Sequence, residues 1–80
     1  MDKKRRQKLK DVVRSLSEVI VAVEQVLEKE LDCIENVPEN LTGSERYECM
    51  ENAVDYLEDA IEKLEEAKVD ITNATAITPK

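Results

Sequence analysis

The sequence predicts an all-α fold, an antiparallel two-helix hairpin of the coiled-coil kind in a single domain covering residues 1–80. Apolar residues recur at three- and four-residue intervals in two long runs. The stretch between the runs, ENVPENLTGSERYECM at residues 35–50, holds the only glycine and one of the two prolines. The composition, 39% charged and 41% hydrophobic without Phe or Trp, is typical of coiled coils and long helices.

Residues 6–35 are predicted to form the first helix, because the apolar residues from Leu9 onward keep to one helical face. With Leu9 at heptad position a, positions a, d and e are three apolar rows. Glu30 is the one charge at position a. It either turns outward as the helix drifts against the heptad repeat or is a buried polar residue that fixes register. The position d row, called the valine row, is Val12, Val19, Val26 and Cys33.

Residues 36–44 are predicted to connect the helices rather than to bind a ligand. Asn36 can end the first helix, Pro38 cannot continue it, and Ser44 can cap the next. Gly43 is expected to give the chain conformational freedom. A phosphate-binding loop needs several glycines and a lysine at fixed spacing, and this stretch has one glycine and no lysine. So short a connector favours antiparallel helices.

Residues 45–73 are predicted to form the second helix, with apolar residues at positions a and e when Met50 is placed at a. Position d is alanine in every heptad, and such short side chains let a neighbouring backbone approach closely. The β-branched tail, residues 74–80, is expected to fray toward Pro79. The position d row, called the alanine row, is Ala53, Ala60, Ala67 and Ala74.

Each helix has more apolar rows than the other helix of one hairpin can cover. Each helix has a single neighbour, which cannot cover positions a, d and e together, and an exposed aliphatic strip favours association. We therefore expect two hairpins to pack face to face into a four-helix bundle. The alternatives are a monomer with an exposed apolar strip and a hairpin that binds a different protein. The expected self-association face is Leu16, Val19, Ile20, Val23, Leu27, Val54, Leu57, Ala60, Ile61, Leu64 and Ala67.

Charge is distributed unevenly along the chain, whose net charge is -7. Residues 1–14 carry seven basic and two acidic side chains, whereas the remainder carries five basic and seventeen acidic ones. The basic residues 3–10 oppose the helix dipole, so the first turn is expected to fray. This basic end could lie on an acidic surface of a neighbouring subunit or partner, bind phosphate, or only improve solubility. No aromatic residue is interleaved with it to stack on bases, so nucleic acid is not an expected partner.

Carboxylates line the outer side of the second helix. We expect them to form a solvated face, since exposed acidic rows are common on helices of this kind. In the alternative interpretation they stand in for phosphates, and the protein is an acidic inhibitor or nucleic-acid mimic that occupies a basic groove of a host nucleic-acid-handling protein. The carboxylates that would bind such a groove are Asp55, Glu58, Glu62 and Glu65.

The chain contains no histidine, which removes the commonest general base and the usual nucleophile pairs. We expect no enzymatic activity, no cofactor and no metal. Cys33 and Cys49 lie at similar distances from the middle of the connector, and they are either small core residues or an oxidisable thiol pair. A zinc site would need two more ligands. No apolar run is long enough to span a bilayer and no export signal follows the charged start, so a cytoplasmic location with reduced thiols is expected.

The run NVPENLTGSERYECMENAVDYLEDAIEKLEEA, residues 36–67, resembles small uncharacterised helical-hairpin proteins encoded by phages and mobile elements of Gram-positive bacteria. The likeness lies in a valine before Pro-Glu, a Ser-Glu-Arg helix start, and Met-Glu-x-Ala followed by acidic Ala/Leu heptads. The most distinctive part is the connector pattern Pro-Glu-x-Leu-x-x-Ser-Glu-Arg. The resemblance implies an accessory protein of a mobile element, and it implies no active site.

Overall fold

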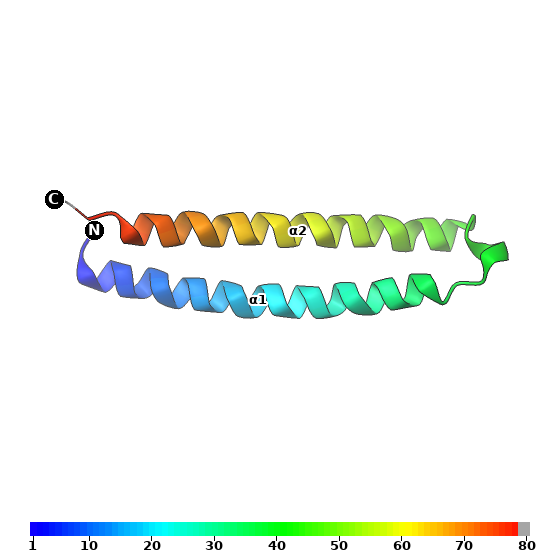
Figure 1. Cartoon of the computed structure of the whole chain (residues 1–80), viewed down its shortest axis with the longest axis horizontal. Coiled ribbons are helices and arrows are strands. Elements are labelled where there is room, and N and C mark those ends of the chain that lie inside the picture. The colour runs from blue at the N-terminus through cyan, green and yellow to red at the C-terminus, as the bar shows by residue number, and fades with distance from the viewer. Residues whose placement is uncertain (79–80) are drawn as a thin grey trace.

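The computed structural model describes residues 1–78, and it is a helical hairpin. Helix α1 covers Lys3–Glu35, a short 3₁₀ helix η1 covers Glu39–Leu41, and helix α2 covers Glu45–Ala76. The two long helices run antiparallel, side by side, so that both chain ends lie at one end of a rod and the connector at the other (Figure 1). The rod measures 63 × 17 × 14 Å. Its radius of gyration is 18.3 Å, well above the roughly 12 Å of a compact domain of this length.

The connector has the boundaries that its sequence indicates. Asn36 caps α1 and its N–H donates to the carbonyl of Asp32, and Ser44 Oγ accepts from the N–H of Tyr47 at the start of α2. Gly43 is not a conformational requirement, because it has no positive φ and a Cβ added to it would meet no atom within 4 Å. A residue with a side chain could therefore occupy this position without backbone strain.

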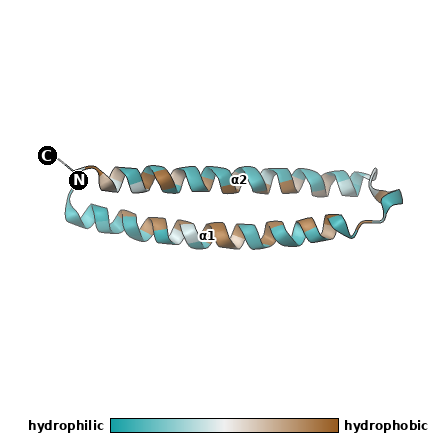
Figure 2. Ribbon diagram, viewed as in Figure 1, coloured by the Kyte–Doolittle hydropathy of each residue, from teal (hydrophilic) through white to brown (hydrophobic). Residues whose placement is uncertain are grey.

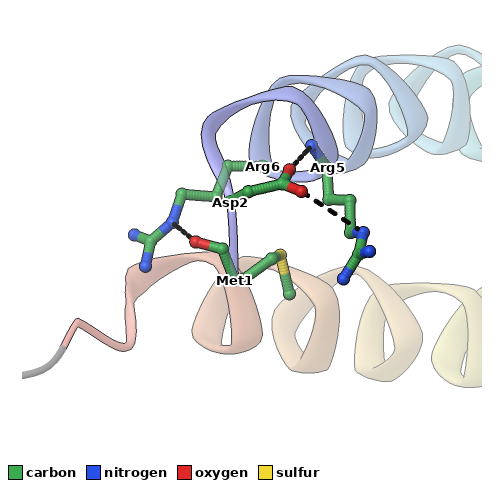
Figure 3. Close-up of polar contacts among 4 residues, drawn as sticks. All are labelled: Met1, Asp2, Arg5 and Arg6. Carbon is green, nitrogen blue, oxygen red and sulfur yellow. Dashed lines mark hydrogen bonds and ion pairs between the residues drawn. The ribbon is translucent and has the colours of Figure 1, made fainter.

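The N-terminus of α1 does not fray. The helix begins at Lys3 rather than near residue 6, because Asp2 caps it and its Oδ1 accepts from the N–H of Arg5 at 2.8 Å (Figure 3). The Asp2 carboxylate also lies 3.6 Å from Nε of Arg5. Its negative charge offsets the unfavourable placement of basic side chains at the positive end of the helix dipole.

Arg6 supplies a second compensation, at the C-terminus of α2. Its guanidinium donates to the carbonyl oxygens of Thr75 at 3.0 Å and Ile77 at 2.8 Å, and also to that of Met1 at 3.1 Å (Figure 3 shows the last of these). The carbonyls of Thr75 and Ile77 lie at the C-terminus of α2, where backbone carbonyls lack helical partners and the helix dipole is negative. The expected fraying of residues 74–80 is wrong for the helical residues up to Ala76, while residues 79–80 lie outside the described part.

The seam between the helices follows heptad positions a and e in both of them. Since the other helix is the only large element of the described chain that can cover these side chains, their reduced exposure marks the line of contact between the helices. Only Ile20 and Val54 are buried among residues 1–78, with 3% and 6% of their surface exposed. Glu30 sits in this seam and is half-buried, so it neither turns fully outward nor lies in a core. The other apolar seam residues are half-buried: Leu9, Val13, Leu16, Val23, Leu27, Ile34, Met50, Leu57, Ile61, Leu64 and Ile71.

Candidate association surface

Hydrophobic residues recur along both helices except the first turns of α1 (Figure 2), but one hairpin covers only part of them. Of the residues expected to form a self-association face, the a and e members lie in the seam and contribute to the hairpin itself. These are Leu16, Ile20, Val23, Leu27, Val54, Leu57, Ile61 and Leu64. Three members lie outside the seam, namely Val19, Ala60 and Ala67, and all three are at heptad position d.

The valine row is the least covered aliphatic row of α1. Val19 has 47% of its surface exposed and Val26 has 52%, and Cys33 is exposed as well, while Val12 is half-buried. The contrast with the seam is sharpest between the consecutive residues Val19 and Ile20, because Ile20 in the seam is only 3% exposed. The valine row therefore runs along the rod immediately beside the seam.

The alanine row occupies the equivalent place on α2. Ala53, Ala67 and Ala74 are exposed, and Ala60 is half-buried. Helix α1 of the same chain therefore leaves three of these four short side chains uncovered. A strip of α2 backbone with little side-chain cover is left open to an approaching surface.

The two rows lie on the same side of the hairpin. In each helix the row is displaced by about 80° from the centre of its seam, in the same sense along the chain. Reversing one helix, as the antiparallel pairing does, brings both displacements to one side. A hollow of about 540 Å³ beside the connector supports this placement, since it is lined by Cys33 of the valine row and by Arg46, seven residues before Ala53. We call the two rows together the valine–alanine face.

The opposite side of the hairpin is acidic. A shallow hollow there is lined by Glu24 and Leu31 from α1 and by Glu58 from α2. Asp55, Glu58, Glu62 and Glu65, the carboxylates proposed to mimic phosphates, are all exposed on adjacent rows of α2. The one ion pair within residues 1–78 joins Asp2 and Arg5, so these four carboxylates have no cationic partner in the described chain.

The two cysteines are free and exposed. The interpretation that Cys33 and Cys49 are small core residues is therefore wrong for the hairpin. Cys33 belongs to the valine row, whereas Cys49 lies one row further from the seam on α2. Whether they form an oxidisable pair stays a prediction.

Reasoning from the sequence missed the part that Arg6 takes. Arg6 precedes Leu9 by three residues and so extends the seam row of α1 toward the end of the rod. A seam position of α1 that lies beside the C-terminus of α2 favours a cation, because that end of the helix dipole is negative. The three-residue spacing between Arg6 and Leu9 therefore carried a signal for this contact.

The described residues hold neither a cluster of metal ligands nor a membrane-spanning helix. Residues 1–78 contain no group of three or more Cys, Asp or Glu residues placed to hold a metal ion. Neither α1 nor α2, as described, has an apolar stretch of the length that a bilayer crossing requires. Comparison of the chain with protein-family models, with curated proteins and with solved structures finds no match.

Proposed function

We propose that this protein acts by non-enzymatic association, first with a second copy of itself, through the valine–alanine face. The observation that carries the proposal is an exposed apolar face along a hairpin that buries only two side chains, Ile20 and Val54, within residues 1–78. Two hairpins packed through this face form a four-helix bundle in which each helix gains a second neighbour. The four-helix bundle thus provides the missing cover for position d.

Surface area supports the proposal. The chain exposes 6516 Å², whereas a compact monomer of 9.1 kDa exposes about 4,900 Å². The excess, roughly 1,600 Å² per chain, is as large as the total area buried in a standard protein interface. A face-to-face dimer therefore has ample surface to bury, and its burial supplies the stability that a chain of this size lacks alone.

The biological setting is part of the same proposal. The resemblance of residues 36–67 to mobile-element proteins supports an accessory protein of a phage or mobile element that works in the cytoplasm of its host. Such a protein acts through what it binds, so the association surface is its working part.

The test compares two valines of equal exposure on the same helix. Val26 lies in the valine row and Val21 outside it, and each has 52% of its surface exposed. Val26→Asp places an unpaired carboxylate in the interface and should raise the dimer dissociation constant by roughly two orders of magnitude. Val21→Asp adds the same charge outside the face and should leave the dissociation constant within about threefold of the unmodified chain. Light scattering on a sizing column measures the mass of both, and equal behaviour of the two variants would reject the proposed face.

A second candidate function rests on the acidic side. Asp55, Glu58, Glu62 and Glu65 are exposed and without cationic partners in the described chain, which suits an inhibitor that occupies a basic groove of a host nucleic-acid-handling protein. Such a complex would weaken steeply with salt. Capture of a DNA- or RNA-binding host protein by the unmodified chain, lost when these four carboxylates are neutralised, would favour this function over the first.

A further inference from the structure

The charges that border the valine–alanine face indicate how a second copy lies on it. One row further from the seam, each helix has an exposed rim. The α1 rim is Lys8, Ser15, Ala22 and Lys29, and the α2 rim is Cys49, Tyr56, Lys63 and Asp70. The rims therefore carry three lysines and a single carboxylate, Asp70, whereas positions b and f, on the other side of the hairpin, carry nine of the nineteen acidic residues.

Positions along the rod follow from the register of the hairpin. The guanidinium of Arg6 reaches the carbonyl of Thr75, and at the far end Cys33 and Tyr47 line the same hollow. Because both helices rise by about 1.5 Å per residue, Lys8 lies near the level of Asn73, within a turn of Asp70. By the same measure Lys29 lies near the level of Asn52, between Cys49 and Tyr56 of the α2 rim.

Two hairpins can meet face to face about a two-fold axis in two ways. With the axis across the rod, α1 lies on the partner's α1 with the connectors at opposite ends. Centred on the middle of α1, at Val19, this places Lys8 near the level of the partner's Lys29 at two symmetric positions. With the axis along the rod, α1 lies on the partner's α2 with both connectors at one end. Lys8 then approaches the partner's Asp70, and no lysine of one rim meets a lysine of the other.

We propose that two copies of this chain associate about an axis parallel to the rod, so that each α1 packs on the α2 of the partner and both connectors lie at the same end. The inference rests on the proposed function and adds to it the orientation of the partner. Charge complementarity favours this orientation, since like charges placed opposite each other cost binding energy and opposite charges select the partner's register.

The cysteines report this orientation directly. Cys33 lies in the valine row near the level of residue 48, and therefore beside the level of Cys49 on α2. In the proposed dimer the valine row lies opposite the partner's alanine row, so Cys33 lies diagonally across from Cys49 of the partner subunit, on the adjoining rim, at two symmetric places. With the axis across the rod, Cys33 instead lies at the opposite end from the partner's cysteines.

The experiment uses two single-cysteine variants, Cys33→Ser and Cys49→Ser, alone and mixed, in a glutathione redox buffer. Glutathione disulfide accepts the two electrons and releases two glutathione thiols for each protein disulfide formed. A disulfide needs Cα atoms within about 7 Å, so only closely facing cysteines are joined. We expect a covalent dimer in the mixture and its loss in either variant alone. Covalent dimers that form as readily in one variant alone as in the mixture, or no covalent dimer in the mixture, would overturn the proposed orientation.

Charge exchange provides a second readout that leaves both cysteines in place. Asp70→Lys should raise the dimer dissociation constant by roughly two- to tenfold, and adding Lys8→Glu in the same chain should restore it. An unchanged dissociation constant in Asp70→Lys overturns the pairing of these rims. Sedimentation of the unmodified chain distinguishes failure of this orientation from failure of the proposed function. A monomer would reject both proposals, whereas a dimer without the expected cross-links would reject only the orientation.

Discussion

The seam and the valine–alanine face are built from the same kind of heptad row, yet the hairpin covers one and leaves the other exposed. Ile20 in the seam is 3% exposed, and its neighbour Val19 in the valine row is 47% exposed. Both are β-branched aliphatic residues in the middle of α1. The difference shows that apolar periodicity predicts that a residue packs against a neighbour. It does not predict whether that neighbour is the other helix of the hairpin or another molecule. One row is covered within the chain, and the other is left exposed, where we propose that a second chain packs.

The largest effect should come from the seam. Ile20→Ala removes a buried side chain from a hairpin with almost no core, and should lower the free energy of unfolding by about 2–5 kcal/mol. Val19→Ala removes a smaller side chain that only a second copy would cover, so its cost should be smaller and should grow with protein concentration. Urea unfolding at several concentrations measures both. Equal losses of unfolding free energy in the two variants, independent of protein concentration, would show that the seam and the valine–alanine face do not differ in this way.

Enlarging the alanine row should have the next largest effect. Ala60→Leu puts a large side chain where we expect the partner's backbone to approach, and overpacking of this kind costs about 1–3 kcal/mol. In a lone hairpin the added leucine extends into solvent from a half-buried site and should cost little. The dissociation constant of the dimer therefore rises while the helical content stays the same by circular dichroism. A dimer that tolerates leucine at this position would show that the alanine row faces solvent.

A smaller effect is expected at the end of the rod. Arg6→Gln removes the charged donor to the carbonyls of Thr75 and Ile77, and should cost about 1 kcal/mol. Lys4→Gln is the matched control, because it removes one positive charge from an exposed position of the same turn. Hydrogen exchange should show faster opening of the last turn of α2 only in the Arg6 variant. Equal exchange in both variants would mean that Arg6 does not hold this end.

The smallest effect should come from the acidic side. Changing Asp55 to asparagine and Glu58, Glu62 and Glu65 to glutamine should leave assembly intact, since exposed charges contribute little to stability. Removing mutually repelling charges can even raise the melting temperature slightly. A loss of dimer in this variant would place the association surface on the wrong side of the hairpin.

The sequence was enough to predict the hairpin and its connector because those features depend on local rules. Apolar spacing selects the helices, and Pro38 and Ser44 mark where one ends and the next begins. The two helix ends at the open end of the rod were harder to predict from the sequence, since they depend on long-range contacts. Arg6 is bonded to residues near the other end of the chain, and no local pattern around residues 74–76 indicates that bond.

The candidate site was predicted only in part for a related reason. The sequence identified positions a, d and e as apolar but could not separate the rows that the second helix covers from the row that stays free. The cysteines show the same limit, because the sequence left Cys33 as either a small core residue or half of an oxidisable pair, and it lies in the exposed valine row. Only the paired geometry of α1 and α2 separates these cases.

Sedimentation equilibrium of the unmodified chain over a wide range of concentrations tests the central claim most directly. We expect the apparent mass to reach twice 9.1 kDa at micromolar concentration, because the valine–alanine face is covered by a second copy. A species that stays at 9.1 kDa up to the highest concentration would contradict the account, and would leave the exposed face to a different protein.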